Sequence, residues 1–424
     1  MHLCLPSLLA LALAAPLPAA DGRGEVYALV DARLEPGDGP ALERATLVIR
    51  RGLIEAVGAT VTAPPDARVL DARGLTLTPG LIDAFGGIGL PEPRKGEAGG
   101  GSGRLTPEAR VIDAVRPAEV VKARDAGITT ALVIPREGVL PGRSVLLDLS
   151  GESAERMALR QPAALHLHLQ AQAQGYPGSL MGVMAVARQQ LLDARRYEQA
   201  RAAYEKAPLG QPRPRYDAGL EAWQDVLAGR LPLFVTAPRE NDLRRTLQLR
   251  DELGIRVVAV NAREAAAALD LLRRERLPLI VGVDFDPPQV AGYGGLDEER
   301  ERRRIDEAER TPARLHEAGL PFALASGHAR DFLAGVRKAV ERGLPREAAL
   351  RAVTLSAAEA LGVADRTGSL TAGKLANVVA WNGSPLTKEA APKWVFVDGV
   401  LYEPEPKADK GEKKDAAPKP EEAR

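Results

Sequence analysis

The chain has 424 residues, 45% of them hydrophobic and 27% charged, which is ordinary for a globular protein and too many residues for one compact core. Its 57 basic residues balance its 57 acidic residues, and aromatic residues make up only 4%. This composition argues against a nucleic acid or an anionic membrane surface as a partner. We therefore expect two domains and no nucleic-acid partner.

The N-terminus is predicted to be an export signal. Residues 3–20 are almost wholly apolar and end in small residues before the first charge, Asp21, although the usual basic start is absent. The prolines in this stretch and its short length argue against a membrane-spanning helix. The one cysteine, Cys4, also lies here, so the mature chain would lack cysteine. We predict a signal peptide over residues 1–20, no membrane span after its removal, and a periplasmic or extracellular protein; a disordered apolar start is the alternative.

Strand-like segments occupy both ends of the chain. Residues 25–78 mix β-branched residues with glycine and proline punctuation, and LANVVAWNG and KWVFVDGVLYEP near the C-terminus have the same character. We predict one small β-sandwich built from residues 21–78 and 368–403. The remaining residues, 404–424, contain no aromatic and no β-branched residue and are predicted to form a disordered charged tail.

The middle of the chain alternates between strand-like and helix-like segments. With LIDAF as the first, about eight apolar strand-like runs occur, and the others are residues 128–134, 144–150, 163–169, 231–237, 255–261, 277–285 and 320–326. This alternation predicts parallel βα units, and the count suits an α/β fold with a (β/α)8 barrel over residues 79–367. A doubly wound sheet is the alternative, but no glycine-rich phosphate loop follows an early strand.

Four segments together resemble the amidohydrolase superfamily, in particular its imidazolonepropionase-like branch. They are RGLIEAVG with LTPGLIDA at the front, DAGITTALVIP, PARLHEAGLPFALAS, and the long return LRAVTLSAAEALGVADRTGSLTAGKLANVVAWNGSPL. The resemblance implies a barrel with metal ligands at the C-terminal ends of its strands. It also implies metal-dependent hydrolysis of non-peptide C–N bonds.

The positions that the resemblance assigns to metal ligands hold other residues. The histidine pair of the first strand aligns with Phe85 and Gly87, the fifth-strand histidine with Thr236, the sixth-strand histidine with Asn261, and the eighth-strand aspartate with Gly327. No position matches the carboxylated lysine of a middle strand. A phenyl ring and a bare backbone cannot ligate a divalent metal. We therefore expect a degenerate, metal-free member, a pseudoenzyme with no cofactor.

His166 and His168 support a second hypothesis, an active hydrolase with a rebuilt site. They alternate with leucines in AALHLHL, so on a strand both imidazoles share one face and would point into the barrel. Zinc or another divalent metal would need further ligands, for which the candidates are Asp83, Asp284, Asp286 and His328. The alternative is a barrel lining whose polar groups are satisfied by their neighbours, with Asp83 structural and the other aspartates capping a loop.

A third hypothesis makes the chain a scaffold or ligand-binding subunit. Loss of the ligands without loss of the surrounding motifs suggests that the fold was kept for its surfaces. The partners would be a paralogous amidohydrolase, a second copy of the chain, or a small molecule in the barrel mouth. No nucleophilic triad is expected, because Ser326 and Ser356 lack a nearby base and no Gly-x-Ser-x-Gly elbow occurs. His316 is predicted to be structural on a helix, and Tyr176 to lie in a turn or line the pocket.

Overall fold

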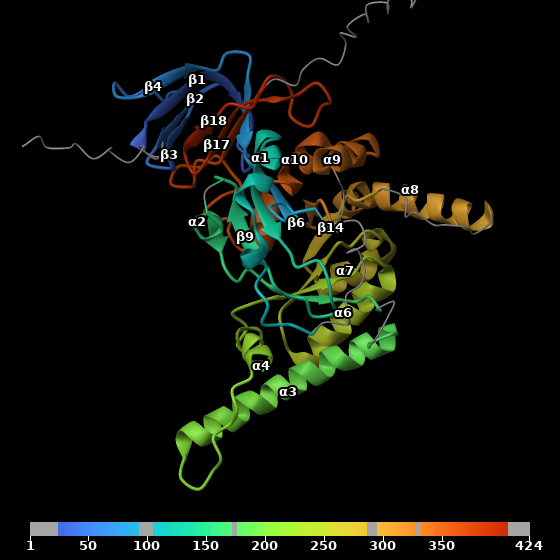
Figure 1. Ribbon diagram of the computed structural model, residues 1–424. Coiled ribbons are helices and arrows are strands. Elements are labelled where there is room, and N and C mark those ends of the chain that lie inside the picture. Colours follow the sequence, from blue (N-terminus) through green and yellow to red (C-terminus); the bar gives the residue numbers. More distant parts are fainter. Residues whose placement is uncertain are drawn as a thin grey trace, which may run out of the picture.

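The computed structural model combines an N- and C-terminal β-sheet region with an α/β barrel (Figure 1). It describes residues 24–92, 105–151, 153–171, 176–285, 295–327 and 331–405. The predicted signal peptide and all but two residues of the predicted tail lie outside the described residues, as do Asp286 and His328. No helix within the described ranges is long and apolar enough to cross a membrane.

Strands from both ends of the chain share one eight-stranded sheet, as the sequence predicts. Its members are β1 (Tyr27–Leu34), β2 (Leu42–Arg50), β3 (Leu53–Gly58), β4 (Arg68–Asp71), β5 (Thr76–Pro79), β16 (Val378–Trp381), β17 (Pro392–Val397) and β18 (Val400–Tyr402). The strand order is β18-β17-β16-β5-β1-β2-β3, with β4 also paired to β1. Leu29, Leu47 and Phe396 are fully buried in its core. The antiparallel β5–β16 pair therefore joins the two ends of the chain.

Eight strands surround the barrel interior. They are β6 (Leu81–Gly86), β7 (Ile128–Val133), the strand made of β8 (Gly142–Arg143) and β9 (Val145–Asp148), β11 (Leu165–His168), β12 (Leu233–Thr236), β13 (Val257–Val260), β14 (Leu279–Gly282) and β15 (Ala323–Ala325). Strands β11 to β15 pair in parallel in chain order, and β6 pairs in parallel with β7. The ring closes between β6 and β15, where the Gly327 amide donates to the Phe85 carbonyl at 2.9 Å.

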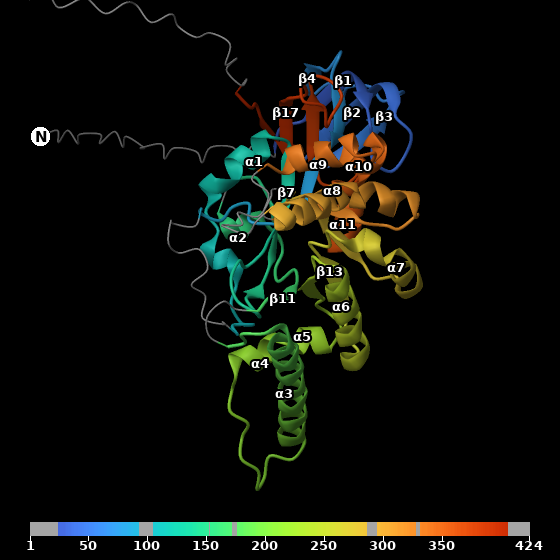
Figure 2. The same ribbon diagram turned by 90° about the vertical axis from the view of Figure 1, so that its right-hand side faces the viewer.

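Helices cover the outside of these strands (Figure 2). The α-helices are α1 (Val121–Asp125), α2 (Ala154–Met157), α3 (Leu180–Lys206), α4 (Ala218–Ala222), α5 (Gln224–Leu227), α6 (Glu240–Leu253), α7 (Leu269–Glu275), α8 (Gly295–Glu317), α9 (Phe332–Glu341), α10 (Arg346–Ala352) and α11 (Leu355–Leu361). Short 3-10 helices are η2 (Val111–Ala114), η3 (Pro117–Val120) and η4 (Ala265–Ala268). The sequence sets several boundaries: Asp331 accepts from the Ala334 amide at the start of α9, and Gly254 ends α6 in the left-handed region.

The third barrel strand departs from the expected parallel arrangement. β9 pairs antiparallel with β7, and β8 pairs antiparallel with β11. The reason is the short connection between Val133 and Gly142, because a parallel return needs a crossover of roughly a dozen residues. Beside β8, the segment that precedes η2 takes the place of β7, where the Arg143 amide donates to the Ala109 carbonyl at 2.8 Å. On the other edge, the short strand β10 (Ala158–Arg160) pairs with β9 just before β11 begins.

Candidate functional site

The barrel mouth lies where β6 and β11 to β15 end. Along β11, Leu165, Leu167 and Leu169 pack in the core that the helices cover, so the two histidines lie on the inner face of the strand. His166 packs between Phe85 and Phe234, with ring-centroid distances of 6.1 and 5.6 Å. The alternation in the sequence therefore predicted the direction of His166 and His168 but not the aromatic rings around the first of them.

His166 is an uncharged imidazole in a dry environment. Its side chain is fully buried, and neither ring nitrogen has a hydrogen-bond partner among the described residues. Burial holds the pKa of His166 well below its usual range, and the neighbouring His168 lowers that pKa further. His168 is only partly buried and pairs in register with Thr236 on β12. The two histidines thus share a strand face but differ in their access to solvent.

The Asp83 side chain joins β6 to β15, the two strands between which the barrel closes. Its carboxylate accepts hydrogen bonds from the Ser326 amide at 2.8 Å and from the Ser326 hydroxyl at 2.6 Å, across the β6–β15 seam. Burial raises the pKa of Asp83, and the bonds from Ser326 oppose that shift. A side chain at Gly86 would overlap both groups, so this glycine makes room for the pair. Nothing in the sequence pointed to Ser326 as the partner, because the two residues are 243 positions apart.

The two glycines at family ligand positions are enclosed by other groups. A Cβ at Gly87 would lie 2.9 Å from the Arg136 guanidinium, so a histidine there would displace that arginine. Gly327 has a φ of +59°, and a Cβ there would lie 3.0 Å from the Asp284 carboxylate. An aspartate at position 327 would therefore meet both backbone strain and a like charge. No sequence motif singled out Arg136.

The other three positions that the resemblance assigns to metal ligands hold buried side chains that make few hydrogen bonds. Phe85 is 1% exposed and lies in the hydrophobic interior of the barrel. The Thr236 hydroxyl and the Asn261 side-chain oxygen are buried and have no hydrogen-bond partner among the described residues. Asn261 also has a φ of +56°, a conformation that is uncommon outside glycine and often marks functional sites.

Asp284 lies at the end of β14 beside Asn261. A side chain at Gly282 would run into the oxygens of both residues, so the two acceptors gather over this glycine. Arg263 holds the strand end, because its guanidinium donates to the Asp284 carbonyl at 3.2 Å and lies 3.7 Å from the carboxylate. This arrangement suits a loop-capping role for Asp284.

The described side chains do not fit the metal site that the resemblance implies. Within the described ranges, no three histidine, cysteine, aspartate or glutamate side chains lie close enough together to hold a metal ion. The mouth offers one buried imidazole, one partly buried imidazole, the Asp284 carboxylate and neutral oxygens. A zinc site needs three or four converging nitrogen, sulfur or carboxylate ligands. Two other residues lie away from such a site: Tyr176 is 65% exposed, and His316 is exposed on α8.

Part of the chain matches a known protein family. Residues 258–402 match the model of the amidohydrolase family. The curated amidohydrolase tasK of Hapsidospora irregularis is 25% identical over 416 residues, covering 86% of this chain and 41% of the relative. The chain thus spans about two fifths of the length of that relative.

Solved structures share the fold at lower sequence identity. An amidohydrolase from Thermotoga maritima MSB8 matches with a TM-score of 0.79 and 22% identity, over 88% of this chain and 99% of the other. A putative prolidase from Bifidobacterium longum matches with a TM-score of 0.53 and 19% identity, over 89% and 95%. A Xaa-Pro dipeptidase with bound methionine matches with a TM-score of 0.58 and 17% identity, over 89% and 100%. Residues 258–402 thus match the amidohydrolase family, and the chain as a whole has the fold of solved amidohydrolases.

Proposed function

We propose that this chain is a metal-free member of the superfamily that has lost metal-dependent hydrolysis and acts by binding. One observation carries the proposal: the positions that the resemblance assigns to metal ligands hold no ligand side chain, and at two of them, Gly87 and Gly327, other side chains lie where a ligand side chain would begin. Gly87 packs against Arg136, and Gly327 is left-handed beside Asp284. Restoring histidine and aspartate there would require the surrounding side chains to move.

The chemistry that a bound metal supplies is an activated water, whose pKa falls to about 7 on a suitable ion. The described residues that lie at the barrel mouth do not replace that nucleophile. His166 is enclosed by Phe85 and Phe234 and both of its ring nitrogens are shielded from solvent, so it cannot take a proton from water. Asp83 already accepts two hydrogen bonds from Ser326 and serves the barrel seam.

A hydrolase with a rebuilt site is the second candidate. It is favoured by the buried polar atoms at the mouth that lack hydrogen-bond partners among the described residues. Each buried polar group without a partner costs roughly 1–3 kcal/mol, and such groups call for an explanation. His166, Thr236 and Asn261 all carry such atoms, and Asn261 has a strained backbone. A ligand bound at the mouth that displaced the Asn261 side chain would supply hydrogen-bond partners to His166 and Thr236.

The binding role that we propose is that of a scaffold or ligand-binding subunit outside the cytoplasm. The apolar N-terminal 20 residues motivate the export, and the kept fold with a changed site motivates the role. A paralogous amidohydrolase or a second copy of the chain would be the protein partner. A small molecule in the barrel mouth is the other ligand that this proposal allows.

The test is a hydrolysis assay on the purified chain supplied with Zn²⁺ or Mn²⁺. Substrates would be N-acyl amino acids, cyclic imides and Xaa-Pro dipeptides, the last suggested by the solved structures that share the fold. We expect no turnover above that of the buffer with metal. Turnover that disappears in a His166→Ala/His168→Ala double variant would contradict the proposal and establish the rebuilt site.

A further inference from the structure

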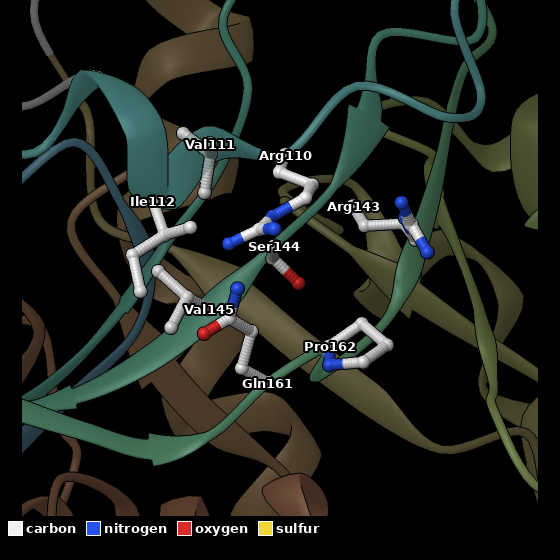
Figure 3. Close-up of a pocket in the computed structure, with 8 residues that line it drawn as sticks. All are labelled: Arg110, Val111, Ile112, Arg143, Ser144, Val145, Gln161 and Pro162. Atoms are coloured by element: carbon white, nitrogen blue, oxygen red, sulfur yellow. The ribbon is translucent and has the colours of Figure 1, made fainter. Parts of the chain in front are cut away.

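A cavity of about 230 Å³ opens beside the third barrel strand (Figure 3). The antiparallel strand β8–β9 forms its floor. One wall comes from η2 and the residue before it, and the other from the connection between β10 and β11. The cavity therefore results from the strand reversal that distinguishes this barrel from a fully parallel one.

The walls of this cavity are fixed by backbone hydrogen bonds. The Arg143 amide donates to the Ala109 carbonyl at 2.8 Å, which ties the floor to the first wall. Ser144 exchanges bonds of 3.0 and 2.9 Å with Ala164 and Ala163, which tie the floor to the second wall. A cavity held in this way needs little ordering on binding, and such preorganisation favours affinity.

One side of the cavity is apolar. Val111, Ile112 and Val145 are buried and contribute hydrocarbon surface, and Pro162 adds its ring. Apolar walls with a few convergent polar groups are typical of small-molecule sites.

The polar lining comes from Arg110, Arg143, Ser144 and Gln161, and none of the described residues that line the cavity is acidic. The Arg143 side chain points away from Arg110 (Figure 3). Figure 3 shows the Arg110 guanidinium beside Ile112, on the side of the cavity that faces Ser144 and Gln161. The ion pair of Arg110 with Asp113 is long at 3.5 Å and solvent-exposed, so much of the Arg110 charge remains available.

Arg143 adds a second, anchored cation. Its guanidinium donates to the Glu108 carbonyl at 2.7 Å, which holds the side chain in place without neutralising its charge. Its Nε is buried and has no acceptor among the described residues. A buried donor to which nothing is bound is costly, and an anion close by would offset part of that cost.

We propose that this cavity binds a small organic carboxylate, with its apolar part against Val111, Ile112 and Val145 and its charge toward Arg110. The Arg110 guanidinium, together with the positive charge of the neighbouring Arg143, selects an anion, and the apolar wall selects an anion that carries hydrocarbon. The site is independent of any chemistry in the barrel mouth. It gives the proposed binding role a ligand class and a location.

The experiment is a ligand-observed NMR titration of the full chain with benzoate and with benzamide, its neutral analogue of the same shape. We expect saturable benzoate binding with a Kd on the order of 1 mM. Benzamide should bind roughly tenfold more weakly or worse, because it carries no negative charge and cannot form an ion pair with a guanidinium. Equal binding of the two, or no saturable benzoate binding, would overturn the proposal.

Arginine variants test whether benzoate binds in this cavity. Arg110→Gln should weaken benzoate binding roughly tenfold, and Arg143→Lys should weaken it less because the charge is kept. Arg230→Gln is the matched control, since Arg230 is an exposed arginine paired with Asp225 on another face. Arg110 is itself exposed, so its replacement should leave the fold intact, as circular dichroism would check. Unchanged benzoate affinity in the Arg110 variant would rule out this cavity.

Discussion

His166 is a buried imidazole whose ring nitrogens have no hydrogen-bond partner among the described residues. If it serves no ligand, its burial is a net cost to the fold. We predict that His166→Leu, of similar volume, raises the free energy of unfolding by about 1–2 kcal/mol, because an unpaired polar group is replaced by an apolar one between two phenyl rings. Urea unfolding followed by circular dichroism would measure the change.

His316→Leu is the matched control for this change. His316 is exposed on α8, so its replacement should alter the free energy of unfolding by no more than about 0.5 kcal/mol. A loss of stability in His166→Leu would contradict the account, because it would mean that the imidazole is engaged by a group or ligand that stabilises it.

The antiparallel third strand depends on Gly142. This glycine has a φ of +117°, and a Cβ there would collide with the Ala109 carbonyl of the loop that pairs with β8. We predict that Gly142→Ala lowers the free energy of unfolding by about 3 kcal/mol or more, because both the backbone and the neighbouring loop would have to shift. The same change should weaken benzoate binding, since this loop forms one wall of the cavity.

Gly74→Ala is the control that separates backbone strain from the collision with Ala109. Gly74 has a φ of +77° but nothing within 4 Å of a Cβ, so its replacement should cost only the roughly 1–2 kcal/mol of backbone strain. Equal losses in the two variants would show that the close approach of Ala109 contributes nothing.

The sequence predicted much of the element pattern but less of how the elements meet. All eight strand-like runs appear in the barrel, because each is a continuous apolar run bounded by turn residues. The reversal of the third strand was missed, although the short stretch between Val133 and Gly142 leaves little room for a crossover. The bonds of Asp83 with Ser326 and the contact of Arg136 with Gly87 join residues far apart in the sequence, so no local pattern could predict them.

A buried polar cluster joins the barrel to the terminal sheet. The Asp148 carboxylate at the end of β9 accepts from the Asn377 amide at 2.7 Å and from Thr130 at 3.5 Å, and the Asn377 side-chain oxygen accepts from the Asp398 amide. Burial raises the pKa of Asp148 from 3.8 to about 7, partly opposed by the bond from Asn377. The folded state therefore holds a proton that the unfolded state releases at lower pH.

This linkage predicts that Asp148 makes the molecule less stable as pH rises from about 4 to about 7. A shift of about three pKa units corresponds to a loss on the order of 4 kcal/mol. His166 acts in the opposite sense, because its lowered pKa makes stability fall as pH drops below 6.5. The measurement is therefore the difference between the unfolding curves of the wild type and Asp148→Asn over this range. A difference that does not change with pH would contradict the predicted protonation.

At the scale of the whole molecule, we propose that the amidohydrolase fold is kept here without a bound metal. The most direct measurement is the metal content of the purified chain, determined by inductively coupled plasma mass spectrometry after dialysis against metal-free buffer without chelator. The account predicts zinc, manganese, iron and nickel all well below one equivalent. About one equivalent of retained zinc, lost in the His166→Ala/His168→Ala double variant, would contradict it.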